Sequence, residues 1–151
     1  RRGLLGPVLE IVGVSIPFTT AAVVLAQAFV SAPLYVRSAR IGFAGDDVQL
    51  EEAAYTEGAN QWQLFRFVML PLAGRALLSG AILAWTRALG EFGATILFAG
   101  NLEGRTQTMP LAIYLGFESD LSLALALSAI LLVVSILLLA VLRRLEAQST
   151  A

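Results

Sequence analysis

The sequence contains neither cysteine nor histidine, and each absence excludes a group of functions. Without cysteine the chain forms no disulfide and offers no thiol nucleophile. Without histidine it lacks the usual imidazole base and the commonest transition-metal ligand. No recognisable pair of a nucleophile and a base remains, so an enzyme is the least favoured class. We expect no catalytic residue, bound metal or cofactor in this chain.

Lysine is absent too: all ten cationic residues are arginine, and the net charge is −1. That balance gives no reason to expect a nucleic-acid partner. Charge is scarce overall, since 14% of the residues are charged and 58% are hydrophobic, and the mean hydropathy is +0.79. In soluble domains roughly a quarter of all residues are charged. The composition therefore predicts an all-α membrane protein whose surface is largely covered by lipid.

Two segments are nearly free of charge and long enough to cross a membrane, which takes about 20 residues in a helix. Residues 14–36 form the first predicted span. Pro17 suits its first turn, and Pro33 near its end predicts a kink or an early stop. Residues 121–143 form the last predicted span.

A third span is predicted at residues 72–99, with a bend or break between Gly90 and Gly93. Small residues recur there at every fourth position and form one ridge on a helix: Ala76, Gly80, Ala84 and Ala88. Such a ridge lets a second helix approach closely in a membrane. Arg87 and Glu91 lie one helical turn apart beside the ridge, so we expect them to pair.

The arginines predict which loops face the cytoplasm, because cytoplasmic loops of membrane proteins are enriched in basic residues. Most of them lie on the side of the loop at residues 38–71: Arg37, Arg40, Arg66, Arg75, Arg143 and Arg144. The other side has Arg105, together with Arg1 and Arg2. We therefore expect residues 38–71 to be cytoplasmic and residues 100–120 to form an external loop.

The predicted cytoplasmic loop contains two short helices separated by a glycine. Glu51 and Glu52 suit the start of the first helix, since negative charge is favourable at a helix N-terminus. Gly58 suits its C-terminal cap, because glycine adopts the left-handed conformation without strain. The second helix carries Trp62 and Phe65. An aromatic, partly polar helix pair outside the membrane indicates a docking surface.

The spacing within this loop resembles that of a known family. Glu52-Ala53-Ala54, three residues, Gly58, nine residues and then Val68-Met69-Leu70-Pro71 resemble the cytoplasmic EAA loop of ABC-importer permeases. In that family the helix before the glycine is the coupling helix, seated in a groove of the ATPase subunit. The resemblance implies that these residues dock the ATPase: Glu52, Ala53, Ala54, Gly58, Trp62 and Phe65. The alternative is a helix pair lying on the membrane surface, although such helices are usually basic and this one is acidic.

Another stretch, residues 87–95, resembles the oxyanion group of these permeases, which carry sulfate, molybdate or tungstate. Residues 98–101 and 104–114 are more similar to molybdate permeases than to sulfate permeases. Residues 102–103 depart from that pattern, with Leu-Glu where it often has Ile-Pro. The resemblance covers about residues 3–144 and implies the ABC-permease fold. This chain would be its C-terminal part, without the earlier spans.

The resemblance implies a transport function in the bacterial inner membrane. Two permease copies, as a homodimer, would form the pathway for molybdate or tungstate. Two ATPase subunits would bind ATP and magnesium, since this chain has no phosphate-binding glycine loop of its own. A periplasmic or surface binding protein would deliver the anion. Two alternatives stay open: a sulfate or thiosulfate permease, and a non-transporting scaffold subunit.

The candidates for the pathway or its gate cluster near the predicted bend: Arg87, Gly90, Glu91, Gly93 and Thr95. A charged group in the membrane interior costs about 2.5–3.5 kcal/mol on insertion scales, so a retained pair requires an explanation. Arg87 and Glu91 either line the path of the anion or satisfy each other and fix the packing of the helices. Gly90 and Gly93 are either hinges or sites of close packing.

Overall fold

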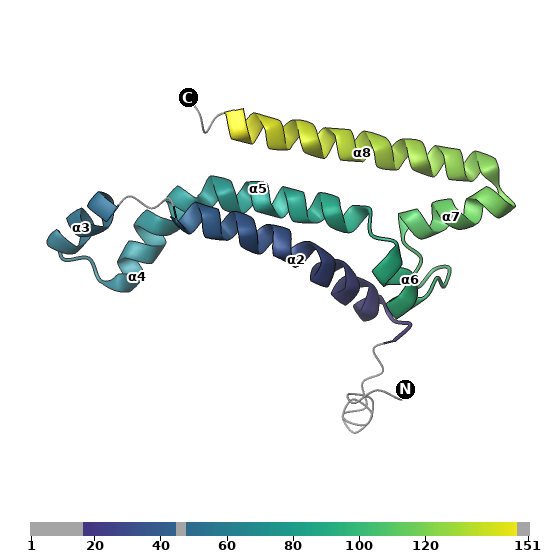
Figure 1. The fold of residues 1–151 in the computed structure, drawn as a ribbon, viewed down its shortest axis with the longest axis horizontal. Coiled ribbons are helices and arrows are strands. Elements are labelled where there is room, and N and C mark those ends of the chain that lie inside the picture. Colours follow the sequence, from purple (N-terminus) through teal and green to yellow (C-terminus); the bar gives the residue numbers. More distant parts are fainter. Residues whose placement is uncertain (1–16, 45–47, 148–151) are drawn as a thin grey trace, which may run out of the picture. The chain divides into compact units, whose positions relative to one another are not determined.

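The structure, a computed structural model, describes residues 17–44 and 48–147, and every regular element among them is helical. The predicted all-α fold is therefore confirmed. The elements follow one another as α2 (Thr20–Ala44), α3 (Val48–Thr56), α4 (Gln61–Leu64), the π-helical turn η1 (Phe65–Met69), α5 (Leu70–Leu89), α6 (Gly93–Ala99), α7 (Met109–Ser119) and α8 (Leu121–Ala147) (Figure 1).

Three helical segments are long and apolar enough to cross a membrane: Thr20–Ala44, Gln61–Leu89 and Leu121–Leu145. A helix of 25 residues, the shortest of them, is about 38 Å long at 1.5 Å per residue and exceeds the hydrocarbon core of about 30 Å. The third segment has the highest hydropathy, 3.1, and only 6% of its most apolar window is buried. Its exposed leucine, isoleucine and valine side chains match a lipid-facing surface.

The helices differ from the predicted organisation in three places. Pro33 does not end α2, which continues to Ala44, past the expected end at residue 36. Membrane helices tolerate an internal proline when neighbouring groups satisfy the freed carbonyl. The second candidate span begins at Gln61, within the segment that we expected to be loop, because α4, η1 and α5 follow one another without a break. In addition, the predicted external loop contains a helix, α7.

The described residues form two compact units, which share α2 and α8. The first unit comprises residues 17–30 and 89–131, and the second comprises residues 31–44, 48–88 and 132–147. Each unit contains its own close helix contacts.

In the second unit, α2 and α5 pack at the ridge of small residues. A Cβ atom added at Gly80 would lie 2.6 Å from the Cβ of Ser38, and one at Gly42 would lie 2.7 Å from the Cβ of Ala76. The Ser38 hydroxyl also donates a hydrogen bond to the backbone oxygen of Ala76, at 2.7 Å. The expected close approach of a second helix is therefore confirmed at Ala76 and Gly80, and that helix is α2.

In the first unit, the start of α2 packs on α6 through a small apolar cluster of Ala22, Val23 and Ala99. Gly100 ends α6 with a φ of 71°, in the left-handed half of the map that favours glycine. Its missing side chain leaves room for the ring of Phe18, whose Cδ1 would lie 2.9 Å from an added Cβ. Any larger residue at position 100 would therefore meet both backbone strain and a clash.

The start of α8 is capped by Asp120. Its Oδ1 accepts hydrogen bonds from the backbone N–H of Leu123, at 3.1 Å, and from the hydroxyl of Ser122, at 2.6 Å. These hydrogen bonds, that from Ser122 first, lower the pKa of the Asp120 carboxyl. The charged side chain thus marks the point where the apolar helix begins.

Candidate functional site

The C-terminal end of α3 is closed by Gly58. Its φ is 86°, so the predicted left-handed cap is confirmed. The backbone N–H of Gly58 donates to the oxygen of Tyr55, and that of Ala59 donates to the oxygen of Ala54, each at 3.0 Å. This pair of bonds is a Schellman motif, which satisfies carbonyl groups that a helix end otherwise leaves free. The chain therefore turns sharply at a defined residue.

The next helix begins three residues later, at Gln61, with a reciprocal cap. The backbone N–H of Gln63 donates to Asn60 Oδ1, and the backbone N–H of Asn60 donates to Gln63 Oε1, each at 2.9 Å. This is a capping box, which our sequence analysis missed although Asn and Gln three residues apart are its signature. With both sides of the turn capped, residues 48–69 form a helix pair of defined geometry. We call residues 48–69 the paired-helix element.

Aromatic side chains connect this element to α2 and also extend into solvent. Phe65 stacks on Phe43, near the end of α2, with ring centroids 6.2 Å apart. Trp62 lies against Phe65 at 5.9 Å between centroids, yet 67% of Trp62 remains exposed. Phe65 therefore anchors the element to α2, while Trp62 presents an apolar surface.

The other residues predicted to dock a partner are accessible in different degrees. Glu52 and Ala53 are exposed, whereas Ala54 is half-buried and supplies a carbonyl to the cap. A Cβ atom added at Gly58 would have no neighbour within 4 Å. The glycine is therefore needed for its backbone conformation rather than for close packing. The structure brings these residues together with Trp62 on a single element.

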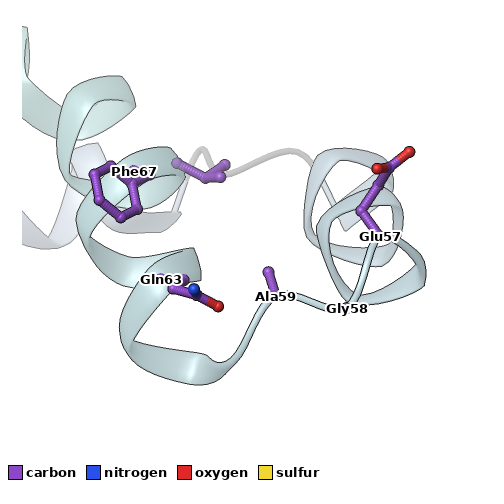
Figure 2. Close-up of a pocket in the computed structure, with 6 residues that line it drawn as sticks. Glu57, Gly58, Ala59, Gln63 and Phe67 are labelled. Atoms are coloured by element: carbon purple, nitrogen blue, oxygen red, sulfur yellow. The ribbon is translucent and has the colours of Figure 1, made fainter.

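A small pocket opens beside the turn, and Figure 2 shows its lining. Its volume is about 300 Å³, and it is lined by Glu57, Gly58, Ala59, Gln63, Phe67 and Val68. Sequence analysis did not assign Glu57 or Phe67 to the docking site, because neither belongs to the spacing that defines the loop.

The second group of candidates lies where the helix breaks. The break predicted between Gly90 and Gly93 is confirmed, since α5 ends at Leu89 and α6 begins at Gly93. Gly90 has no neighbour within 4 Å of an added Cβ, and Gly93 has only Glu91 Oε1, at 3.9 Å. Neither glycine is therefore a site of close helix packing among the described residues.

Glu91 lies in the predicted break, between α5, which carries Arg87, and α6. The expected pairing of Arg87 with Glu91 stays a prediction. The Glu91 side chain is only 6% exposed, and its Oε1 accepts a hydrogen bond from the backbone N–H of Ala94, at 2.8 Å. Glu91 thus satisfies a free N–H at the start of α6, where negative charge is favourable.

Beyond the break, three buried oxygen atoms have no hydrogen-bond partner among the described residues: Thr95 Oγ1, Asn101 Oδ1 and Thr108 Oγ1. Thr95 is completely buried. A buried polar group without a partner costs roughly 1–3 kcal/mol, so such groups are uncommon without a reason. All three belong to the segment from α6 to the start of α7.

Three membrane-length helices, close packing through small residues and a capped, accessible paired-helix element define a helical membrane protein with several spans. Residues 4–149 match the family described as binding-protein-dependent transport system inner membrane component, and the chain belongs to that family. It is an inner-membrane component.

Relatives with assigned names are similar over most of this chain. It is 47% identical over 137 residues to the molybdenum transport system permease protein ModB of Mycobacterium tuberculosis, covering 91% of this chain and 52% of that protein. It is 41% identical over 144 residues to ModB of Escherichia coli K12, covering 91% and 63%. It is 41% identical over 130 residues to the sulfate transport system permease protein CysW of Synechococcus elongatus, covering 84% and 46%. The chain thus spans about half the length of these relatives.

Proposed function

We propose that this chain forms part of the permease subunit of a binding-protein-dependent ABC importer, and that its cargo is molybdate or tungstate. The observation that carries the transport function is the capped, accessible paired-helix element in a chain of the inner-membrane component family. The assignment of the cargo rests on the relatives named as molybdenum permeases. One of them has a higher identity to this chain than the sulfate relative does, 47% against 41%. The other has the same identity of 41% but covers more of this chain, 91% against 84%.

In this proposal the paired-helix element docks an ATPase subunit through Glu52, Ala53, Ala54, Gly58, Trp62 and Phe65. Two ATPase subunits bind ATP and magnesium, and two permease copies form the pathway. An external binding protein delivers the anion. Closure of the ATPase pair would displace α3 and the turn at Gly58. Because Gln61–Leu89 is one helical segment, such a displacement would pass along it toward the break at Gly90.

The pathway would pass near the break. Thr95 supports this assignment, since its buried hydroxyl has no partner among the described residues and can donate to an oxyanion. Glu91 supports a structural role instead, because its carboxylate already caps α6. Arg87 would attract the anion, while Gly90 and Gly93 would allow the two helices to change their angle.

ATP hydrolysis by the reconstituted importer tests this function. We expect the binding protein loaded with molybdate to stimulate hydrolysis at least about fivefold over the unloaded binding protein, because transporters of this kind couple delivery of cargo to closure of the ATPase pair. Stimulation by sulfate but not by molybdate would replace the cargo and keep the class. An assembled complex that responds to neither anion would contradict the importer and favour the scaffold subunit.

A further inference from the structure

The pocket beside Gly58 has the size and lining of a receptor for a single side chain. At about 300 Å³ it lies at the lower limit for small-molecule sites. Figure 2 shows Phe67 and Glu57 on opposite sides of it, with Ala59 and Gln63 between them. Phe67 is 72% exposed and offers a bare aromatic face. The lining therefore combines apolar surface with an acidic residue on the opposite side, whose carboxylate points outward (Figure 2).

An acidic residue at position 57 does not stabilise α3. This residue is the last before Gly58, at the C-terminal end of α3, where the helix dipole disfavours negative charge. Its carboxylate forms no hydrogen bond or ion pair with any residue in the described ranges. A residue that opposes local stability, with no compensation among the described residues, favours a requirement for a contact with another molecule.

The lining determines which kind of side chain fits. A purely apolar side chain would remove water from the Glu57 carboxylate and give it no partner, which is costly. An acidic side chain would be repelled. Arginine and lysine have a hydrocarbon stem that covers apolar surface and a charged head that stays at the rim. The face of Phe67 also attracts a cation.

We propose that this pocket receives one arginine or lysine side chain of the ATPase subunit. The stem lies against Phe67 and Ala59, and the cationic head pairs with the Glu57 carboxylate. This inference rests on the proposed function and adds to it a specific contact outside the EAA spacing. It makes recognition of the ATPase depend on the charge at Glu57 as well as on the helix that precedes it.

Binding of the ATPase subunit to the permease in lipid nanodiscs tests the proposal, with the substitutions Glu57→Gln and Glu57→Lys. We expect Glu57→Lys to weaken binding at least about tenfold, as loss of a charge-assisted hydrogen bond predicts. Glu57→Gln should also make binding less sensitive to salt than in the wild type. Lysine at the end of α3 is favourable for the helix, so unfolding of α3 would not explain the loss.

The matched control is Gln61→Lys, which also raises the charge of the element by one but does not line the pocket. We expect it to change binding by less than about twofold. Equal binding by wild type and Glu57→Lys would overturn the pocket proposal while leaving the importer intact. Failure of the wild type to bind the ATPase would instead contradict the proposed function. A photo-crosslinker at Phe67 should label a segment of the ATPase that contains Arg or Lys, and labelling of a segment with neither would also overturn the pocket proposal.

Discussion

Replacing Gly58 by proline should lower binding of the ATPase at least about tenfold and reduce ATP-driven uptake to near background. Proline fixes φ near −65° and has no N–H, whereas Gly58 has a φ of 86° and donates its N–H to Tyr55. The turn must therefore rearrange, and the two helices lose the angle that presents Glu52 and Trp62 together. Binding in nanodiscs and uptake in proteoliposomes measure the two effects.

The control for this prediction is a pair of alanine substitutions. Gly58→Ala and Gly104→Ala carry the same conformational cost, since Gly104 has a φ of 70° and both positions have open space around an added Cβ. We expect Gly58→Ala to weaken ATPase binding several-fold, which corresponds to about 1 kcal/mol of strain. Gly104→Ala, in the predicted external loop, should leave binding unchanged. Equal losses in both variants would mean that general destabilisation, rather than the turn, controls binding.

Replacing Gly80 by leucine should destabilise the protein more than any surface change in the same helix. An added Cβ would already lie 2.6 Å from the Cβ of Ser38, so α2 and α5 must separate. Overpacking of a close contact typically costs about 1–3 kcal/mol, and we expect the upper end because backbones as well as side chains must move. The hydrogen bond from Ser38 to Ala76 should be lost as well. Unfolding in mixed micelles measures the change.

Gly74→Leu provides the comparison within the same helix. No atom lies within 4 Å of an added Cβ at Gly74, so leucine there meets no neighbour and should change stability by less than about 0.5 kcal/mol. The ridge of small residues is not the site of contact with α2 if the two leucine variants unfold at the same denaturant concentration.

The sequence contained enough information for the span-forming segments and for the turn at Gly58. Charge-free runs and the positive φ that only glycine adopts easily are local properties, so they are readable without tertiary structure. The ridge at Gly80 was also predictable, because a repeat of small residues has one common use in membranes. The partner of that ridge was not, since nothing in its spacing selects α2.

Sequence analysis missed the continuity of α4 with α5, because a proline such as Pro71 often marks the boundary of a helix. In the structure η1 precedes Pro71, and the backbone N–H of Leu70 bonds to the oxygen of Phe65, five residues earlier. A wider π turn lets a helix continue where proline cannot donate its own hydrogen bond. The role of Glu91 as the cap of α6 was missed because it depends on where α5 ends. Spacing placed Glu91 near Arg87, but it did not reveal that α5 ends at Leu89 and that the backbone N–H of Ala94 donates to the Glu91 carboxylate.

The central claim is that the paired-helix element is the site at which the ATPase docks. The absence of cysteine allows one direct measurement: single cysteines placed by Glu52→Cys or Glu118→Cys, each with a short thiol-to-amine crosslinker, in membranes that contain the assembled importer. Both positions are exposed, and they lie on opposite sides of the predicted topology. The account predicts a crosslink to the ATPase from Glu52→Cys and none from Glu118→Cys. No crosslink from Glu52→Cys, or equal yields from both positions, would contradict it.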